Sequence, residues 1–147
     1  MSNSKSILAS IWVVRIIIFL IFSSVFIIPT LGNYYSQIAN QNADISLPVT
    51  IGFYILLIPA NSTMITLHML LMNIKKGNLF SKQNIAFLAM ICAGLFIIGG
   101  ISLIMAIFSW IFSFVSVAFL FVAVILLVII NVFKQAIIIK QENDFTI

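Results

Sequence analysis

Charge is scarce in this sequence. Only 7% of its residues are Asp, Glu, Lys or Arg, while 63% are hydrophobic; roughly a quarter of the residues are charged in typical soluble domains. A water-soluble core could not bury that much apolar surface. With 147 residues, four spans of about 20 residues each use most of the chain. We therefore expect an all-α polytopic membrane protein with four transmembrane helices in an up-down bundle.

Groups that could carry out chemistry are also few. The chain has one His, one Cys and three carboxylates. Asp44 is far in sequence from Glu142 and Asp144, and Cys92 lies inside an apolar run, where we expect a packing role. A single cysteine excludes an intrachain disulfide. No metal cluster or nucleophile–base pair can be assembled from residues so placed. We predict that the protein is not an enzyme and uses no cofactor or metal.

The seven Lys and Arg residues, which give a net charge of +4, lie at the edges of apolar runs. They form no basic patch interleaved with aromatic residues, so nucleic acid is excluded as a partner and the lipid bilayer is the expected one. Three of the seven lie within residues 73–82. An excess of Lys and Arg marks cytoplasmic segments. We therefore place loop 73–82, tail 134–147 and both termini in the cytoplasm.

The apolar runs define the spans of a single domain, 1–147. The predicted spans are residues 7–28, 49–72, 83–108 and 114–133. The segment 29–48 contains no Lys or Arg, as expected of an outer loop, and a short surface helix is expected near residues 34–40. Ser81 is a predicted N-cap. Small residues of the third span predict close helix packing, at Ala86, Ala89, Ala93, Gly94, Gly99 and Gly100.

Polar side chains within the spans are the first candidate site. Asn61, Thr66 and His68 lie in the second span, which also contains Pro59, and Arg15 lies in the first. Because a polar stripe facing lipid is costly, Asn61 and His68 should face the bundle interior. Their role stays open between hydrogen bonds that join helices and a ligand or ion path. Arg15 is expected near the cytoplasmic interface with Trp12, or in a polar cavity of the bundle.

The cytoplasmic side supplies a second candidate site, in which the tail folds back on the loop. There the tail carboxylates could reach the loop lysines, with apolar burial near Phe80. The residues assigned to this contact are Lys75, Lys76, Phe80, Lys82, Glu142, Asn143 and Asp144.

Three short segments resemble a known family. The loop reads KKGNLFS at residues 75–81, with Asn84 opening the next helix, and the end of the chain reads NVFKQA at 131–136 and KQENDFTI at 140–147. Together they resemble the DUF2975 family, small four-span bacterial membrane proteins of unknown function. The resemblance implies a four-helix architecture and a cytoplasmic-membrane location. It supplies no reaction and therefore no catalytic residue.

Two function classes follow. The preferred one is a non-enzymatic membrane protein that binds another membrane component, which could be a partner protein, a second copy of itself, or a membrane-active peptide, as in bacteriocin self-immunity. The alternative is a small transporter or channel subunit with a polar path at Asn61 and His68. A transporter is expected to show intramembrane charges or paired helix breaks, and only Pro59 breaks a span here.

Overall fold

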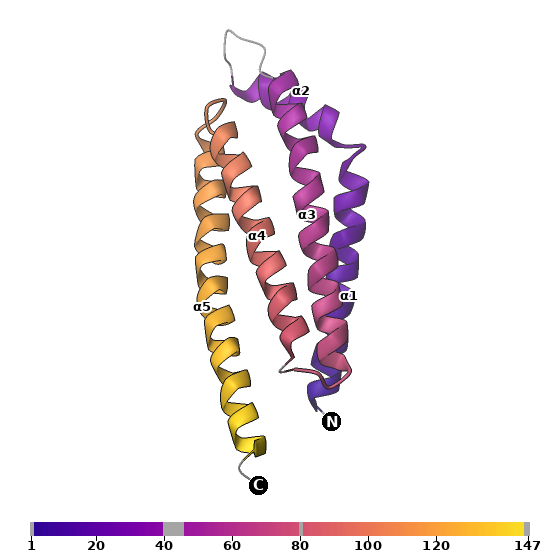
Figure 1. Cartoon of the computed structure of the whole chain (residues 1–147). Coiled ribbons are helices and arrows are strands. Elements are labelled where there is room, and N and C mark those ends of the chain that lie inside the picture. The colour runs from indigo at the N-terminus through magenta and orange to yellow at the C-terminus, as the bar shows by residue number, and fades with distance from the viewer. Residues whose placement is uncertain (1, 40–45, 80, 146–147) are drawn as a thin grey trace.

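The computed structural model describes residues 2–39, 46–79 and 81–145. Within them the chain is all-α, with five helices (Figure 1): α1 (Ser2–Ser24), α2 (Ile28–Ala39), α3 (Ser46–Lys75), α4 (Lys82–Met105) and α5 (Ile111–Phe145). Four are long and apolar enough to cross a membrane, over Lys5–Ser24, Ser46–Lys75, Lys82–Met105 and Ile111–Ile139. This confirms the all-α class and the four span-length helices.

The first helix ends earlier than its apolar run. Residues 25–27 form a turn after Ser24. α2 then begins at Ile28, the last residue of the predicted first span, and so starts earlier than the surface helix expected near residues 34–40. Pro29 contributes to the break, because it has no N–H to donate to Val25 O and its ring would clash with that carbonyl in a continuous helix. Ser23 and Ser24 also donate to carbonyls of α1, at 2.9 Å from Phe19 O and 2.6 Å from Ile21 O.

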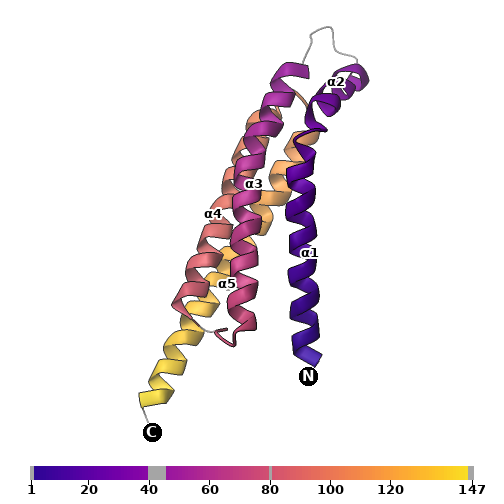
Figure 2. The same ribbon diagram turned by 90° about the vertical axis from the view of Figure 1, so that its right-hand side faces the viewer.

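The other helix ends also differ from the predicted spans. α3 is continuous through Pro59. α4 ends at Met105, three residues before the predicted end of the third span at residue 108, so the turn that follows also begins earlier than predicted. α5 begins at Ile111 and ends at Phe145, so it includes most of the tail predicted at residues 134–147. In Figures 1 and 2 the end of α5 extends beyond the α3–α4 loop.

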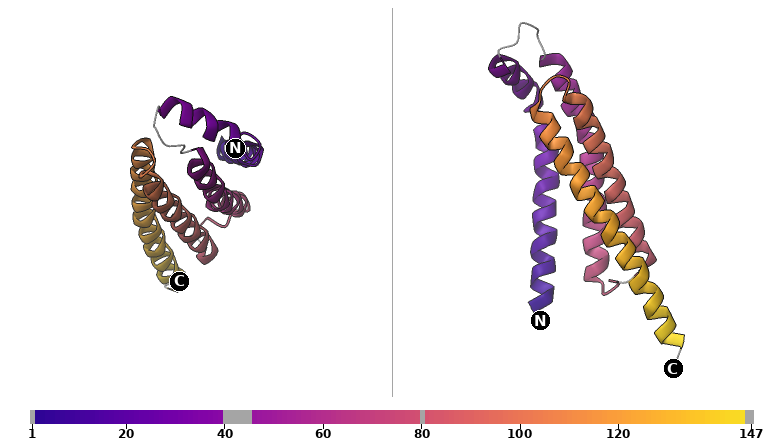
Figure 3. Two further views of the ribbon diagram at one scale, coloured as in Figure 1. Left: turned by 90° about the horizontal axis from the view of Figure 1, so that it is seen from above. Right: turned by 90° about the vertical axis from the view of Figure 1, so that its left-hand side faces the viewer.

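The four long helices form an open arc. The N terminus, the α3–α4 loop and the end of α5 lie at one end of the molecule, and α2 lies at the other (Figure 1). The extensive contacts are α1 with α3, α3 with α4, α4 with α5, and α2 with α3. Viewed from above (Figure 3, left), α1 and α5 are the two ends of the arc. The arc is open because α1 and α5 have no extensive contact with each other.

Two apolar clusters hold the arc together. One joins α3, α4 and α5, with buried residues Leu70, Leu88, Ile91, Cys92, Ala123 and Ile130. The other, at the α2 end, contains Val49, Met105 and Phe112, and the Phe112 ring lies 5.7 Å from that of Phe53 and 6.1 Å from that of Tyr35, centroid to centroid. Aromatic pairs at such distances add to the burial of apolar area. The core is therefore centred on α3–α4–α5, and α1 is attached at its side.

Glycines set the close approaches of α4. A Cβ atom on Gly94 would overlap Thr63 Oγ1 of α3, and one on Gly99 would come within 2.8 Å of Leu120 of α5. The Ser116 hydroxyl of α5 donates to Gly99 O at 2.8 Å. The close packing predicted for this helix is thus made at Gly94 and Gly99. The predicted alanines take no part in it, because Ala86, Ala89 and Ala93 are exposed.

Candidate functional site

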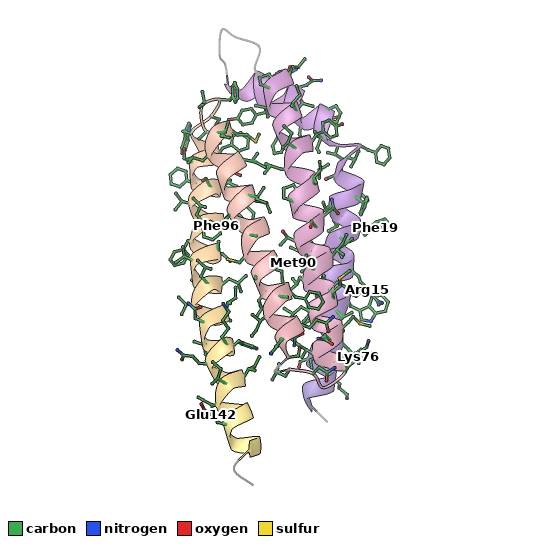
Figure 4. All side chains as sticks on the ribbon, viewed as in Figure 1. Arg15, Phe19, Lys76, Met90, Phe96 and Glu142 are labelled. Carbon is green, nitrogen blue, oxygen red and sulfur yellow. The ribbon has the colours of Figure 1, made fainter. Side chains whose placement is uncertain are left out.

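A groove runs along the outer side of α3, between α1 and α4. Its volume is about 640 Å³. It is lined by Phe22 and Val25 of α1, by Leu57, Ile58, Asn61, Ser62, Ile65, Thr66 and Met69 of α3, and by Met90 of α4, which is labelled in Figure 4. This surface, called the α3 groove below, is apolar apart from three neutral polar side chains. It therefore brings together two of the predicted site residues, Asn61 and Thr66.

Asn61 is the polar group of the groove with unused bonding capacity. Its side chain is half-buried, and Nδ2 donates to Leu57 O, one turn earlier, at 2.9 Å. Its Oδ1 atom is buried and has no hydrogen-bond partner among the described residues. A buried acceptor without a partner costs about 1–3 kcal/mol. Because the atom is buried, a donor from outside the chain can pair with it only after the Asn61 amide rotates toward the groove.

The threonines of α3 are satisfied within their own helix. Thr66 donates to Ser62 O at 2.8 Å, and Thr63 donates to Pro59 O at 2.7 Å. Both side chains are buried. Such bonds to the preceding turn are the usual arrangement for hydroxyl side chains in helices. Thr66 therefore contributes shape to the groove and has no free hydroxyl proton to offer a ligand.

His68 and Arg15 lie outside the α3 groove. His68 is half-buried, two helical turns from Asn61, and its Nδ1 atom is buried without a hydrogen-bond partner among the described residues. Arg15 is exposed, with its guanidinium carbon 5.5 Å from the centre of the Trp12 ring. That contact is a cation–π interaction within α1. The structure thus does not join Arg15 or His68 to Asn61 in one cavity.

The α3–α4 loop is organised by Asn84, whose importance the sequence analysis missed. Asn84 is 1% exposed. Its Nδ2 donates to Asn78 O at 2.6 Å and Leu79 O at 2.8 Å, and its Oδ1 accepts from Asn73 Nδ2 at 2.7 Å. A buried amide that makes all these bonds fixes the loop on the ends of both helices. The sequence signal for this role is the position of Asn84 in the first turn of α4, directly after the loop.

The loop also confirms the predicted N-cap of α4 and explains why residue 77 is a glycine. Ser81 is the N-cap of α4, and its Oγ accepts from Asn84 N at 3.2 Å. Gly77 has a φ of 87°, a left-handed geometry that glycine adopts without strain. The conspicuous loop sequence therefore has a structural role, which is to make a tight, capped connection.

The predicted contact between loop and tail stays a prediction. Lys75, Lys76 and Lys82 are exposed, and Glu142 is exposed on the helical extension of α5. Figure 4 shows Lys76 and Glu142 on separate elements. Phe80 and the side chains of Asn143 and Asp144 lie outside the described residues.

The described residues contain no group of three or more His, Cys, Asp or Glu side chains that could hold a metal ion. What the α3 groove offers chemically is apolar contact and hydrogen bonding by neutral groups. Such a surface suits binding within a membrane.

One comparison with known proteins identifies the family. The model for proteins of unknown function designated DUF2975 matches residues 30–147. The chain belongs to the DUF2975 family. The match covers α3, α4 and α5 and most of α2, so it includes the loop and tail segments that carried the resemblance. No curated protein and no solved structure matches this DUF2975 chain.

Proposed function

We propose that this DUF2975 protein is a non-enzymatic integral membrane protein that binds a helix of another membrane component in the α3 groove. The observation that carries the proposal is the buried, unpartnered Asn61 Oδ1 in that groove. Around it, Ile58 is 76% and Met90 59% exposed, so the walls can contact a partner. Helix association in membranes is driven by packing and by hydrogen bonds between helices. A Ser, Thr, Asn or Gln donor on the partner would pair with Asn61 Oδ1 once the amide rotates toward the groove.

A photo-crosslinking side chain at Ile65 tests this proposal. Ile65 lines the groove, whereas Val122 of α5 lies elsewhere and is similarly exposed. We expect position 65 to give a crosslink to a defined polypeptide in cells, and position 122 to give lipid adducts only. The mass of the adduct separates a partner protein, a second copy and a membrane-active peptide, which includes the case of self-immunity. Lipid adducts alone at both positions would refute the proposal.

Substitution of Asn61 gives a second, quantitative test. We expect Asn61→Leu to weaken the crosslinked association about 3- to 18-fold, since hydrogen bonds between membrane helices average about 0.6 kcal/mol and reach about 1.7 kcal/mol. Ser62→Leu is the matched control, because Ser62 is an exposed groove residue next to Asn61. An equal loss in both variants would mean that the size of the added leucine, and not the loss of the Asn61 acceptor, weakens the association. Ion flux through liposomes carrying Asn61→Leu and His68→Leu variants tests the transporter alternative.

The proposal includes a topology in which the helices cross the membrane up and down, with both termini and residues 73–82 in the cytoplasm. Its support is the clustering of Lys75, Lys76 and Lys82 at the end of the molecule that carries the N terminus (Figure 1). In a Cys92→Ala background, a single cysteine replacing Asn40 should react with an impermeant thiol reagent on intact cells. A cysteine replacing Asn78 should react only after lysis. The reverse pattern would show that the protein is inverted.

A further inference from the structure

A second pocket lies at the loop end of the molecule, between the last turns of α3 and the first turns of α4. It is lined by apolar and polar side chains in equal number, which are Met69, Met72, Asn73, Lys76, Gln83 and Phe87. Its volume is about 270 Å³, whereas sites for drug-sized ligands occupy about 300–1,000 Å³. This surface, called the Lys76 pocket below, therefore has room for a small group or for the head of a larger molecule.

The Lys76 pocket lies where two span-length helices reach their ends. The candidate span of α3 ends at Lys75, and that of α4 begins at Lys82. The polar lining residues lie next to these ends, whereas Met69 and Phe87 lie more than one turn further into the spans. Met69 also lines the α3 groove. The pocket is therefore polar at the level of the membrane surface and adjoins an apolar surface at the level of the lipid chains.

The charge and the donors of the pocket suit an anion. Lys76, labelled in Figure 4, and Gln83 are exposed, so both are open to a ligand. Asn73 Nδ2 donates to Gln83 Oε1 at 3.4 Å, a bond that uses the oxygen of the Gln83 amide and not its Nε2 donors. A lysine carries three donors and a glutamine amide two. Lys75 and Lys82 add positive charge beside the pocket, and none of the lining residues that the structure describes is acidic.

We propose that the Lys76 pocket binds the head group of an anionic phospholipid, whose phosphate accepts hydrogen bonds from Lys76 Nζ and Gln83 Nε2. Basic pockets between membrane-spanning helices bind the head groups of such lipids. The first part of the acyl chain contacts Met69 and Phe87, which a soluble phosphate has no chain to reach. The site does not depend on the function proposed for the α3 groove.

Native mass spectrometry of the full chain, delipidated in a neutral detergent, tests the proposal. Three probes are titrated: phosphatidylglycerol, phosphatidylcholine with the same acyl chains, and glycerol 3-phosphate, which is a soluble analogue of the head group. We expect saturable binding of one phosphatidylglycerol per chain. Phosphatidylcholine should bind about 5-fold more weakly, because its ammonium group offsets the attraction of about one lysine. Glycerol 3-phosphate should not bind at the same concentrations.

Two charge-matched pairs of variants locate the bound lipid. Lys76→Gln should weaken binding of phosphatidylglycerol about 5-fold, whereas Lys75→Gln, which removes the same charge outside the pocket lining, should change it little. Gln83→Glu places a like charge beside the phosphate and should weaken binding about 10-fold or more. Gln135→Glu makes the same change on α5 and should have little effect. All four residues are exposed, so the variants are expected to fold.

Equal losses in the two lysine variants would overturn the proposal, because they would show a general attraction to the basic end of the molecule. Equal affinities for the two lipids would also overturn it. Glycerol 3-phosphate that binds as tightly as phosphatidylglycerol would show a site for soluble phosphates instead of a lipid site. Asn61→Leu should leave lipid binding unchanged, so the failure of this proposal and that of the α3 groove can be told apart.

Discussion

Replacing Asn84 with alanine is expected to lower the free energy of unfolding by about 2–4 kcal/mol. The substitution removes three short side-chain hydrogen bonds, to Asn78 O, Leu79 O and Asn73 Nδ2. Each is worth about 0.5–1.5 kcal/mol, and a partner atom that stays shielded from water after the substitution adds a desolvation cost. Because Asn84 is 1% exposed, water cannot readily replace the lost groups. The effect is measurable as a fall in the midpoint of thermal or denaturant unfolding in detergent.

Asn78→Ala is the matched control for this loop. Asn78 is exposed and contributes its backbone carbonyl to the network, so the same chemical change there should shift the midpoint little. Proteolysis offers a second measurement, because a loosened loop should be cut faster after Lys75 and Lys76 in Asn84→Ala alone. Similar unfolding midpoints for the two variants would show that the buried amide does not hold the loop.

Gly94→Ala should destabilise the protein by about 1–3 kcal/mol, whereas Gly100→Ala should leave its stability unchanged or raise it slightly. The added Cβ at 94 would overlap Thr63 Oγ1. Thr63 cannot turn away without losing its bond to Pro59 O, so α3 and α4 must move apart, and overpacking of this kind costs about 1–3 kcal/mol. At Gly100 nothing lies within 4 Å of an added Cβ, and alanine is the better helix former.

A double variant identifies the source of the Gly94 effect. Thr63→Ala removes the obstructing hydroxyl, so Gly94→Ala should cost less in that background than in the natural chain, as expected of residues in direct contact. Both costs are read from denaturant unfolding in the same detergent. An equal cost in the two backgrounds would mean that the contact with Thr63 is not the reason why an alanine at position 94 destabilises the protein. A Gly100→Ala variant as unstable as Gly94→Ala would mean the same.

The sequence by itself determined the number and approximate places of the span-length helices, because long apolar runs with few charges are stable as helices that span a membrane. It also determined the Ser81 cap, which depends on local chemistry within one turn. The sequence predicted the helix ends less well than the helices themselves. Pro29 is a local signal for the break after α1, but α5 continues to Phe145, well beyond the predicted end of the fourth span at residue 133.

Only the tertiary structure decided which faces of the helices meet. In a soluble helix, alternation of polar and apolar residues marks the buried face; in a membrane helix the face toward lipid is as apolar as the face toward a neighbour. The sequence therefore could not tell that Gly94 packs on α3 while Ala93 is exposed. Nor could it tell that Asn84 folds inward to the loop, or that α1 and α5 stay apart. Those outcomes depend on shape complementarity between segments distant in sequence, which no local pattern records.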